Sequence, residues 1–384
     1  MNTSWWLSPD DLDPTQKVFV MLPPEGRLIL QGPPGSGKTN LLLLRAQYIV
    51  ARGETNVLVL TFTNALVDFI RKGAEAKGIL SGDQIRTFHS WAASHIREYL
   101  DVSIVAEGDE FDDEARARTL ALLLQANEKA STSKLYQAIF VDEAQDLSVQ
   151  ELEALLCLSD KICVSGDIRQ GIFHQDGLNI GEKLGLKSYV LEKHYRIGQR
   201  IARVADTLLP PETGMPSLEQ SSNYNAKLYG TSTAEMHSCS SKDAEFEKMI
   251  EELKVQVLAF QGDHIGVLCA KRETAKDVYS RFQGTEFANQ VEIYGGPGTG
   301  FGDGKTIHVL TLHSAKGTEF RAVHLFATEE WKKHPFNRTT LAYTAITRAK
   351  TALRAYRTGD TSHRLEAAFA RPKHVEFDEL FPEN

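Results

Sequence analysis

Short apolar runs alternate along the chain with longer segments that carry apolar side chains at helical spacing. In the first half, such runs occupy residues 27–31 (RLILQ), 56–61 (NVLVLT), 136–141 (YQAIFV) and 161–164 (KICV). Each run stops at glycine or polar residues, which is typical of strands buried on both faces of a parallel sheet. Residues 39–51 and 64–72 are predicted to be helices. The first half is therefore expected to be an α/β domain.

The second half repeats this rhythm. Apolar runs at 264–269, 291–294, 306–311 and 322–326 predict strands, and residues 244–260, 273–282 and 337–350 predict helices. We therefore expect an α/β protein of two domains, residues 1–190 and 191–384, each with a parallel sheet flanked by helices. The acidic stretch 107–114 predicts a solvated loop within a small insertion at about 94–133, and residues 294–304, with six glycines in eleven positions, predict a flexible loop.

Length and charge limit the classes of protein. The chain has 384 residues, enough for two or more domains, and a net charge of −8, which argues against a wholly basic binder of nucleic acid. Local patches could still contact phosphates. The N-terminus has neither a basic segment nor an apolar run, and no stretch approaches a membrane span, so we expect a cytoplasmic protein. The four cysteines form no CxxC pair and are expected to be buried, reduced thiols.

Residues 32–39 (GPPGSGKT) match the pattern G-x-x-x-x-G-K-[ST] between a predicted strand and a predicted helix. Glycines allow backbone N–H groups to close around phosphates, Lys38 would reach the β- and γ-phosphates, and the Thr39 hydroxyl would ligate Mg²⁺. The alternative, a chance match in a glycine-rich turn, is disfavoured by this context. The predicted phosphate site comprises Gly32, Pro33, Pro34, Gly35, Ser36, Gly37, Lys38 and Thr39.

A pair of acidic residues follows the apolar run 136–141. Asp142 would hold Mg²⁺ together with Thr39, and Glu143 would orient and deprotonate an attacking water. Acidic residues after an apolar run also cap helices, so the pair is a weak signal by itself. Combined with the glycine-rich loop, it predicts an enzyme that binds a phosphate ligand together with Mg²⁺.

Residues 141–148 (VDEAQDLS) resemble motif II of superfamily 1 helicases of the UvrD/Rep type. The family's other motifs have counterparts in the same order: LDPTQ (12–16), TFTNALV (61–67), RTFHSWA (86–92), SGDIRQGIF (165–173), LEKHYRIGQRIA (191–202), LTLHSAKGTEF (310–320) and LAYTAITRAK (341–350). The resemblance covers nearly the whole chain. It implies two RecA-like domains with ATP in the cleft between them.

The resemblance also implies roles for single residues. Gln16 would select adenine, Tyr195 would stack on it, and Glu319 would contact the ribose; taken alone, Tyr195 could equally be a core residue and Glu319 a helix cap. Arg196 and Arg348 resemble the family's arginine fingers, although Arg348 alone could be a solvated arginine. The implied catalytic residues are Lys38, Glu143, Gln170, Arg196 and Arg348, and the nucleotide-binding residues outside the phosphate loop are Gln16, Tyr195, Gly317 and Glu319.

By the same resemblance, both domains would line a groove for single-stranded DNA, with RNA as the open alternative. Bases would stack on aromatic side chains, although Phe62 could equally be a core residue at a strand end. The matching positions are Phe62, Thr63, Asn64, His89, Phe173 and His313.

The sequence departs from the family in two ways. Gln175 and Asp176 stand where an aromatic–arginine pair is usual, and the insertions at 94–133 and 294–304 are short. We therefore expect an ATP-dependent DNA helicase or translocase moving 3′ to 5′. The alternative is a nucleic-acid-stimulated ATPase subunit with weak unwinding, regulating a partner such as a nuclease in a repair complex or a phage-defence system resembling Gabija. A binding module with a degenerate nucleotide site is disfavoured by the intact motifs.

Overall fold

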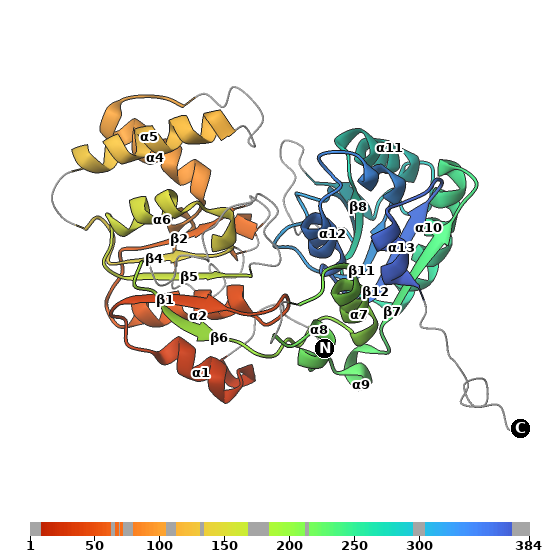
Figure 1. Cartoon of the computed structure of the whole chain (residues 1–384), viewed down its shortest axis with the longest axis horizontal. Helices are drawn as coiled ribbons and strands as arrows, with labels where there is room; N and C mark the ends of the chain where they lie inside the picture. The colour runs from red at the N-terminus through yellow and green to blue at the C-terminus, as the bar shows by residue number, and fades with distance from the viewer. Residues whose placement is uncertain are drawn as a thin grey trace, which may run out of the picture.

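The computed structural model describes residues 9–62, 66–68, 70–71, 80–104, 113–130, 134–167, 184–211, 215–294 and 304–370. Two α/β lobes lie side by side, the first coloured red to yellow-green and the second green to blue (Figure 1). Each lobe contains one six-stranded sheet, and every pairing between neighbouring strands is parallel. The expected fold class, two parallel sheets flanked by helices, is confirmed.

The first sheet has the strand order β3-β2-β4-β5-β1-β6. Its elements, in chain order, are η1 (Pro9–Asp11), α1 (Pro14–Met21), β1 (Arg27–Gln31), α2 (Lys38–Ala51), β2 (Val57–Thr61), η2 (Gly82–Gln84), β3 (Ile85–Thr87), α4 (Phe88–Leu100), α5 (Asp113–Lys129), β4 (Ala138–Val141), η3 (Ala144–Asp146), α6 (Val149–Leu156), β5 (Ile162–Gly166) and β6 (Lys187–Val190).

The central strands of this sheet are mainly apolar because both of their faces are covered. In β1, Leu28 and Leu30 pack in one cluster with residues of α2, whereas Ile29 between them packs in a second cluster with residues of α4 and α6. Successive side chains of a strand point to opposite faces, so only a continuous apolar run satisfies both layers. This requirement explains why the four runs of the first half were recognisable in the sequence.

The second sheet has the strand order β7-β12-β11-β8-β10-β9. Its elements are α7 (Gln199–Leu208), α8 (Leu218–Ser221), α9 (Ala226–Tyr229), β7 (Thr233–Ser238), α10 (Lys242–Ala259), β8 (Ile265–Cys269), α11 (Arg272–Phe282), β9 (Val291–Ile293), β10 (Ile307–Thr311), β11 (Phe320–Leu325), η6 (Thr328–Lys332), α12 (Thr339–Ile346), β12 (Ala349–Arg357) and α13 (His363–Phe369). The two domains are named below by these sheets.

Four strands were not predicted from the sequence. The strands β6 and β7 are edge strands, so they carry polar residues and lack the fully buried pattern, and β3 is only three residues long. The expected helix at 337–350 is wrong at its end, because α12 stops at Ile346 and β12 begins at Ala349. Apolar residues continue through both elements, so hydrophobic content alone did not mark the change from helix to strand.

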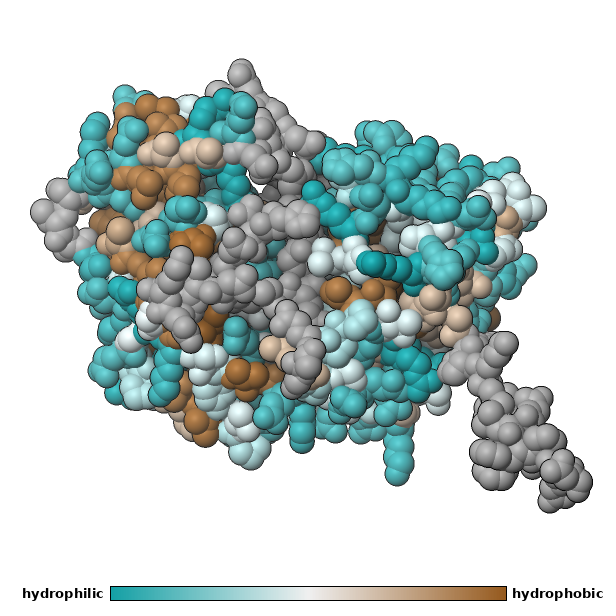
Figure 2. All heavy atoms as spheres, in the orientation of Figure 1, coloured by the Kyte–Doolittle hydropathy of each residue, from teal (hydrophilic) through white to brown (hydrophobic). Residues whose placement is uncertain are grey.

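The predicted insertion, residues 94–133, comprises the end of α4 and the helix α5. The helices α4 and α5 pack on each other, and α5 also contacts α6; in Figure 1 they lie at the outer end of the domain. Apolar side chains are visible on this side of the molecule in Figure 2, in contrast to the mostly hydrophilic second domain, and Leu124 of α5 is exposed. The acidic stretch 107–114 lies largely outside the described residues.

All four cysteines are free thiols. Cys163 and Cys269 are buried, but Cys157 is exposed and Cys239 is partly buried, so the expectation of buried thiols is wrong for Cys157 and incomplete for Cys239. Cys157 directly follows the last turn of α6, where the chain turns at the surface. None of the helices in the described ranges is long and apolar enough to cross a membrane.

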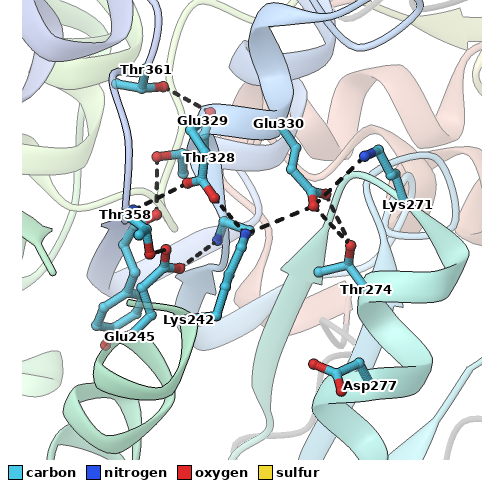
Figure 3. A network of polar contacts seen from close by, with 12 residues as sticks. Lys242, Glu245, Lys271, Thr274, Asp277, Thr328, Glu329, Glu330, Thr358 and Thr361 are labelled. Atoms are coloured by element: carbon cyan, nitrogen blue, oxygen red, sulfur yellow. Dashed lines mark hydrogen bonds and ion pairs between the residues drawn. The ribbon is translucent and has the colours of Figure 1, made fainter. Parts of the chain in front are cut away.

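A polar network lies at the carboxyl ends of β8 and β11 in the second sheet (Figure 3). The Glu330 carboxylate of η6 lies 3.7 Å from the ammonium groups of both Lys242 and Lys271, at the starts of α10 and α11. It also accepts a hydrogen bond of 2.9 Å from the Thr274 hydroxyl. The network therefore links η6 to the first residues of α10 and α11.

Candidate nucleotide-hydrolysis site

The glycine-rich loop joins the end of β1 to the start of α2. Gly35 and Gly37 have φ angles of 75° and 88°, and Gly37 is the N-cap of α2. This left-handed conformation is strained for other residues. A Cβ atom at Gly35 would also lie only 3.3 Å from the Cβ of Arg196. The loop therefore depends on glycine, and it leads into a helix N-terminus whose free N–H groups favour anions.

Lys38 lies at the base of the loop. Its ammonium group donates hydrogen bonds to the carbonyl oxygens of Gly32 (2.8 Å) and Pro33 (2.9 Å). Burial lowers the pKa of Lys38, and the nearby carboxylates of Asp167 and Glu143 oppose this shift. The side chain is thus fixed by its own loop, in a position from which phosphate oxygens could replace the carbonyl groups.

Asp142 directly follows β4 and is buried. Its carboxylate accepts hydrogen bonds of 2.6 Å from the hydroxyl groups of Thr39 and Ser165. Burial and the charge of Glu143 raise the pKa of Asp142 to about 6. Ser165 was not singled out from the sequence. It lies near the end of β5, the strand next to β4, so its hydroxyl reaches Asp142 at the end of β4.

The oxygen donors at this position fit Mg²⁺. A hydroxyl and a carboxylate are hard ligands, and a bound cation would offset both the burial of Asp142 and its repulsion from Glu143. Within the described ranges, no group of three His, Cys, Asp or Glu side chains is placed to hold a metal ion by itself. A Mg²⁺ ion bound here would accordingly share its coordination with water and phosphate oxygens, as is usual for this ion.

Glu143 is the N-cap of η3 and has a φ angle of 55°, an uncommon conformation for a residue other than glycine. Gln145 donates a hydrogen bond to its carboxylate and accepts one from the Asp167 N–H (3.1 Å). Burial would raise the pKa of Glu143, but the charges of Lys316, Arg348 and Lys38 outweigh burial and lower it. The carboxylate is therefore ionised and available as a base.

The second domain brings cationic groups to this site. Arg196 donates two hydrogen bonds of 2.7 Å to Glu319, and Lys350 lies 3.5 Å from the same carboxylate. Burial raises the pKa of Glu319, but these two cations reverse the shift and hold it at about 2. Arg348 is buried and donates to the carbonyl of Thr318 (3.1 Å).

Both arginines lie near the phosphate loop. The backbone N–H of Tyr195, the residue before Arg196, donates to the Gly35 carbonyl (3.2 Å). The positive charge of Arg348 contributes to lowering the pKa values of both Lys38 and Glu143. Arg196 thus lies beside the phosphate loop, and Arg348 lies within electrostatic reach of Lys38 and Glu143.

A pocket of about 230 Å³ opens beside the loop. The Tyr195 hydroxyl donates to Asp13 (2.6 Å), and burial together with this contact raises the pKa of Tyr195 to about 12. Gln16 forms a capping box with Asp13 and donates to the Ser36 carbonyl (3.3 Å). The pocket is lined by Asp11, Asp13, Gln16, Gly35, Ser36, Gly37, Tyr195, Arg196, Tyr224, Tyr229, Asp263, Arg321 and Lys350.

Five lining residues of the second domain were missed by sequence reasoning: Tyr224, Tyr229, Asp263, Arg321 and Lys350. Tyr224 and Tyr229 belong to no recognised motif, and Arg321 lies one residue beyond one. The Arg321 guanidinium lies 5.0 Å from the centroid of the Tyr229 ring and donates to the Tyr229 carbonyl (2.6 Å). Gly317, by contrast, is not among the lining residues; a Cβ there would meet Leu66 of the first domain at 3.0 Å.

The predicted nucleic-acid contacts fall into two groups. Phe62, just after β2, and His89, in the first turn of α4, meet edge to face with ring centroids 5.1 Å apart. His313 meets Phe336 within the second domain at 6.4 Å. The remaining predicted positions lie outside the described residues: Thr63, Asn64, Gln170 and Phe173, together with the divergent Gln175 and Asp176.

These features define a class of protein. A glycine-rich phosphate loop, an acidic pair after a neighbouring strand and arginines from a second parallel sheet are the parts of a two-domain P-loop nucleoside triphosphatase.

Comparison with known proteins specifies the family. An AAA domain family matches residues 16–175, and the UvrD-like helicase C-terminal domain family matches residues 306–356. No curated protein sequence matches the chain. The two family matches support a UvrD-like helicase of superfamily 1, and the protein is a nucleotide-hydrolysing enzyme of the helicase type.

Two solved structures illustrate the similarity. The C-terminal domain of a possible DNA helicase from Lactobacillus plantarum WCFS1 is 16% identical, with a TM-score of 0.34, over 45% of this chain and 93% of that one. The PRRSV helicase is 14% identical, with a TM-score of 0.42, over 89% of this chain and 54% of that one. The match therefore spans about half the length of the PRRSV protein. Both TM-scores are low, so the family assignment rests on the two sequence families.

Proposed function

We propose that the protein is a motor that couples ATP hydrolysis to movement along single-stranded DNA in the 3′ to 5′ direction. The observation that carries this proposal is the meeting of the two domains at the phosphate loop. Arg196 of the second domain lies against Gly35 of the loop, and the charge of Arg348 acts on Lys38 and Glu143 of the first domain. A nucleotide held between these groups would draw the domains together, and hydrolysis would release them.

The phosphate loop, residues 32–39, would hold the triphosphate, with Thr39 and Asp142 as the ligands of Mg²⁺. The metal would neutralise part of the phosphate charge when bound. Glu143 would accept a proton from water as the water oxygen attacks the γ-phosphorus and the bond from that phosphorus to the leaving ADP breaks. Arg196, Arg348 and Lys38 would stabilise the charge on the transferring group, with Gln170 as a proposed sensor of the γ-phosphate.

The pocket beside the loop would receive the nucleoside. Tyr195 supplies a ring that can stack on adenine, and Gln16 holds its amide at the same pocket. In this structure Glu319 binds Arg196 and Lys350, so a ribose contact by Glu319 requires sharing the carboxylate with these cations. Gly317 does not line the pocket, so its role would be to allow the backbone conformation of the segment that carries Glu319.

The nucleic acid would bind across both domains. Phe62 and His89 present a pair of rings in the first domain, and His313 presents one in the second. Stacking on such rings tolerates any base sequence, as a translocating enzyme requires. Thr63, Asn64 and Phe173 remain proposed contacts by motif resemblance, and RNA is the alternative ligand.

A second function is favoured by the small size of the insertions. Residues 101–137, between α4 and β4, include the helix α5 among their described positions, and thirteen residues separate β9 from β10. Neither connection has the length of a further folded domain. The alternative function is therefore an ATPase stimulated by nucleic acid, which unwinds weakly alone and regulates a partner such as a nuclease.

The test compares ATP turnover of the wild type and of Glu143→Gln, each with and without single-stranded DNA or RNA. Loss of the base should reduce turnover by about 10²- to 10⁴-fold while ATP still binds. Glu153→Gln, at an exposed position of α6, is the matched control and should behave as wild type. Nearly full turnover by Glu143→Gln would refute the assigned base. A duplex-unwinding assay then separates the motor from the regulatory ATPase.

A further inference from the structure

Arg116 projects from the insertion helix α5 onto the segment that follows the catalytic acids. Its guanidinium donates to the backbone carbonyl of Asp146 (2.7 Å) and to the carboxylate of Glu151 (2.8 Å). Glu151 is buried and closes the capping box that begins α6. One arginine of the insertion therefore holds both η3, which follows Glu143, and the start of α6.

The same guanidinium faces the proposed nucleic-acid surface. The central carbon of the Arg116 guanidinium lies 6.0 Å from the centroid of the Phe62 ring, within the range of a cation–π contact. The Phe62 ring also meets the His89 ring edge to face, so Arg116 contacts one member of this aromatic pair. Arg116 thus contacts two features at once. One is the Phe62 ring, on which nucleobases would stack, and the other is the segment that follows Glu143, the proposed catalytic base.

Asp146 is contacted from the second domain as well. The Lys316 ammonium forms an ion pair with its carboxylate and lies 3.9 Å from the Glu143 carboxylate. Both members of the Lys316–Asp146 pair are almost fully buried. The backbone N–H of Asp146 also donates to the Glu143 carbonyl (3.0 Å). A displacement at Asp146 is therefore transmitted to Glu143 through this hydrogen bond and through Lys316.

We propose that Arg116 is a positioning residue that couples nucleic acid at Phe62 to ATP hydrolysis, by holding the Asp146 carbonyl until a base or phosphate draws its guanidinium away. This inference rests on the proposed function, because it requires turnover to depend on nucleic acid. Release of Asp146 changes the position of Lys316 between the two carboxylates, and hence the environment of Glu143. The insertion helices then serve to regulate the ATPase in addition to any contact with duplex.

The experiment measures the ATP turnover number and the KM for ATP with and without saturating oligothymidine, in Arg116→Ala, Arg116→Lys and wild type. We expect the ratio of stimulated to unstimulated turnover to fall by about fivefold or more in Arg116→Ala, with little change in KM. Arg116→Lys keeps the charge but lacks the fork that reaches Asp146 and Glu151 together, so its ratio should fall as well. Arg118→Ala, an exposed arginine on the same helix, should match wild type.

A structural defect and a loss of coupling are separated by a double-mutant cycle. If the coupling passes through Phe62, then Phe62→Leu lowers the ratio of stimulated to unstimulated turnover. Adding Arg116→Ala should lower this ratio little further, because the two substitutions interrupt the same pathway. Fully additive effects, or a ratio in Arg116→Ala within about twofold of wild type, would overturn the inference. If Arg116→Ala does not fold, Arg116→Lys and the Phe62→Leu pair give the same readout. A wild type that no single-stranded nucleic acid stimulates would overturn the proposed function and this inference together.

Discussion

Replacing Glu319 by glutamine tests the electrostatics of the cleft. The carboxylate is 16% exposed, and Arg196 and Lys350 are both directed at it. Its pKa is lowered from 4.5 to about 2 by these cations against the opposing effect of burial. At about 1.4 kcal/mol for each pKa unit, the ionised form stabilises the fold by about 3 kcal/mol at neutral pH. Glu319→Gln removes this term and leaves two cations close together.

The expected loss of about 3 kcal/mol would lower the Tm by roughly 6–12 °C for a domain of this size. Because the folded-state pKa lies below the unfolded value, the stabilisation is complete above pH 4.5 and is lost as the pH falls towards 2. At pH 3 the difference between wild type and variant in unfolding free energy should narrow by about half.

Urea unfolding followed by circular dichroism gives the difference in unfolding free energy. The control is Glu219→Gln, which breaks the exposed pair with Arg203 and should cost less than about 1 kcal/mol. Equal losses in the two variants would show that the contacts of Glu319 in the cleft are no stronger than a surface ion pair. A difference that does not depend on pH would show that the carboxylate charge is not the cause.

Three further changes test the nucleotide site. Because the pKa of Asp142 is raised to about 6, its ionised fraction and hence the affinity for Mg²⁺ with ADP should be about tenfold lower at pH 5 than at pH 7 by calorimetry; a flat profile would exclude Asp142 as a ligand. Gly35→Ala should lower the free energy of unfolding by about 1–2 kcal/mol and weaken ADP binding in a thermal-shift assay. Gly53→Ala, also at positive φ but facing open space, should lower stability without affecting ADP binding. Equal ADP binding by the two variants would contradict the crowding at Arg196. Tyr195→Phe keeps the ring and loses the hydrogen bond to Asp13, worth about 1 kcal/mol, so KM for ATP should rise by about fivefold, less than in Tyr195→Ala; the reverse order would argue against stacking.

Much of the fold was predictable because the central strands of each sheet are covered on both faces. Such strands carry apolar side chains on both faces, and runs such as Leu28–Leu30 of β1, Val57–Leu60 of β2 and Val309–Leu310 of β10 have this property whatever surrounds them. Edge strands have no such requirement. β6 and β7 were missed for this reason. The predicted helix 337–350 ran into the first two residues of β12, and the rest of that strand was not predicted.

The sequence by itself also determined the phosphate loop and the acidic pair, since the glycines, Lys38 and Asp142–Glu143 act from contiguous segments. Only the tertiary structure placed Ser165 on Asp142, Lys316 between Asp146 and Glu143, and Arg116 over Phe62. Each of these contacts joins segments far apart in the chain. The free energy of a polar contact depends on the distance between its two partners and on their burial, and neither quantity exists until the chain has folded.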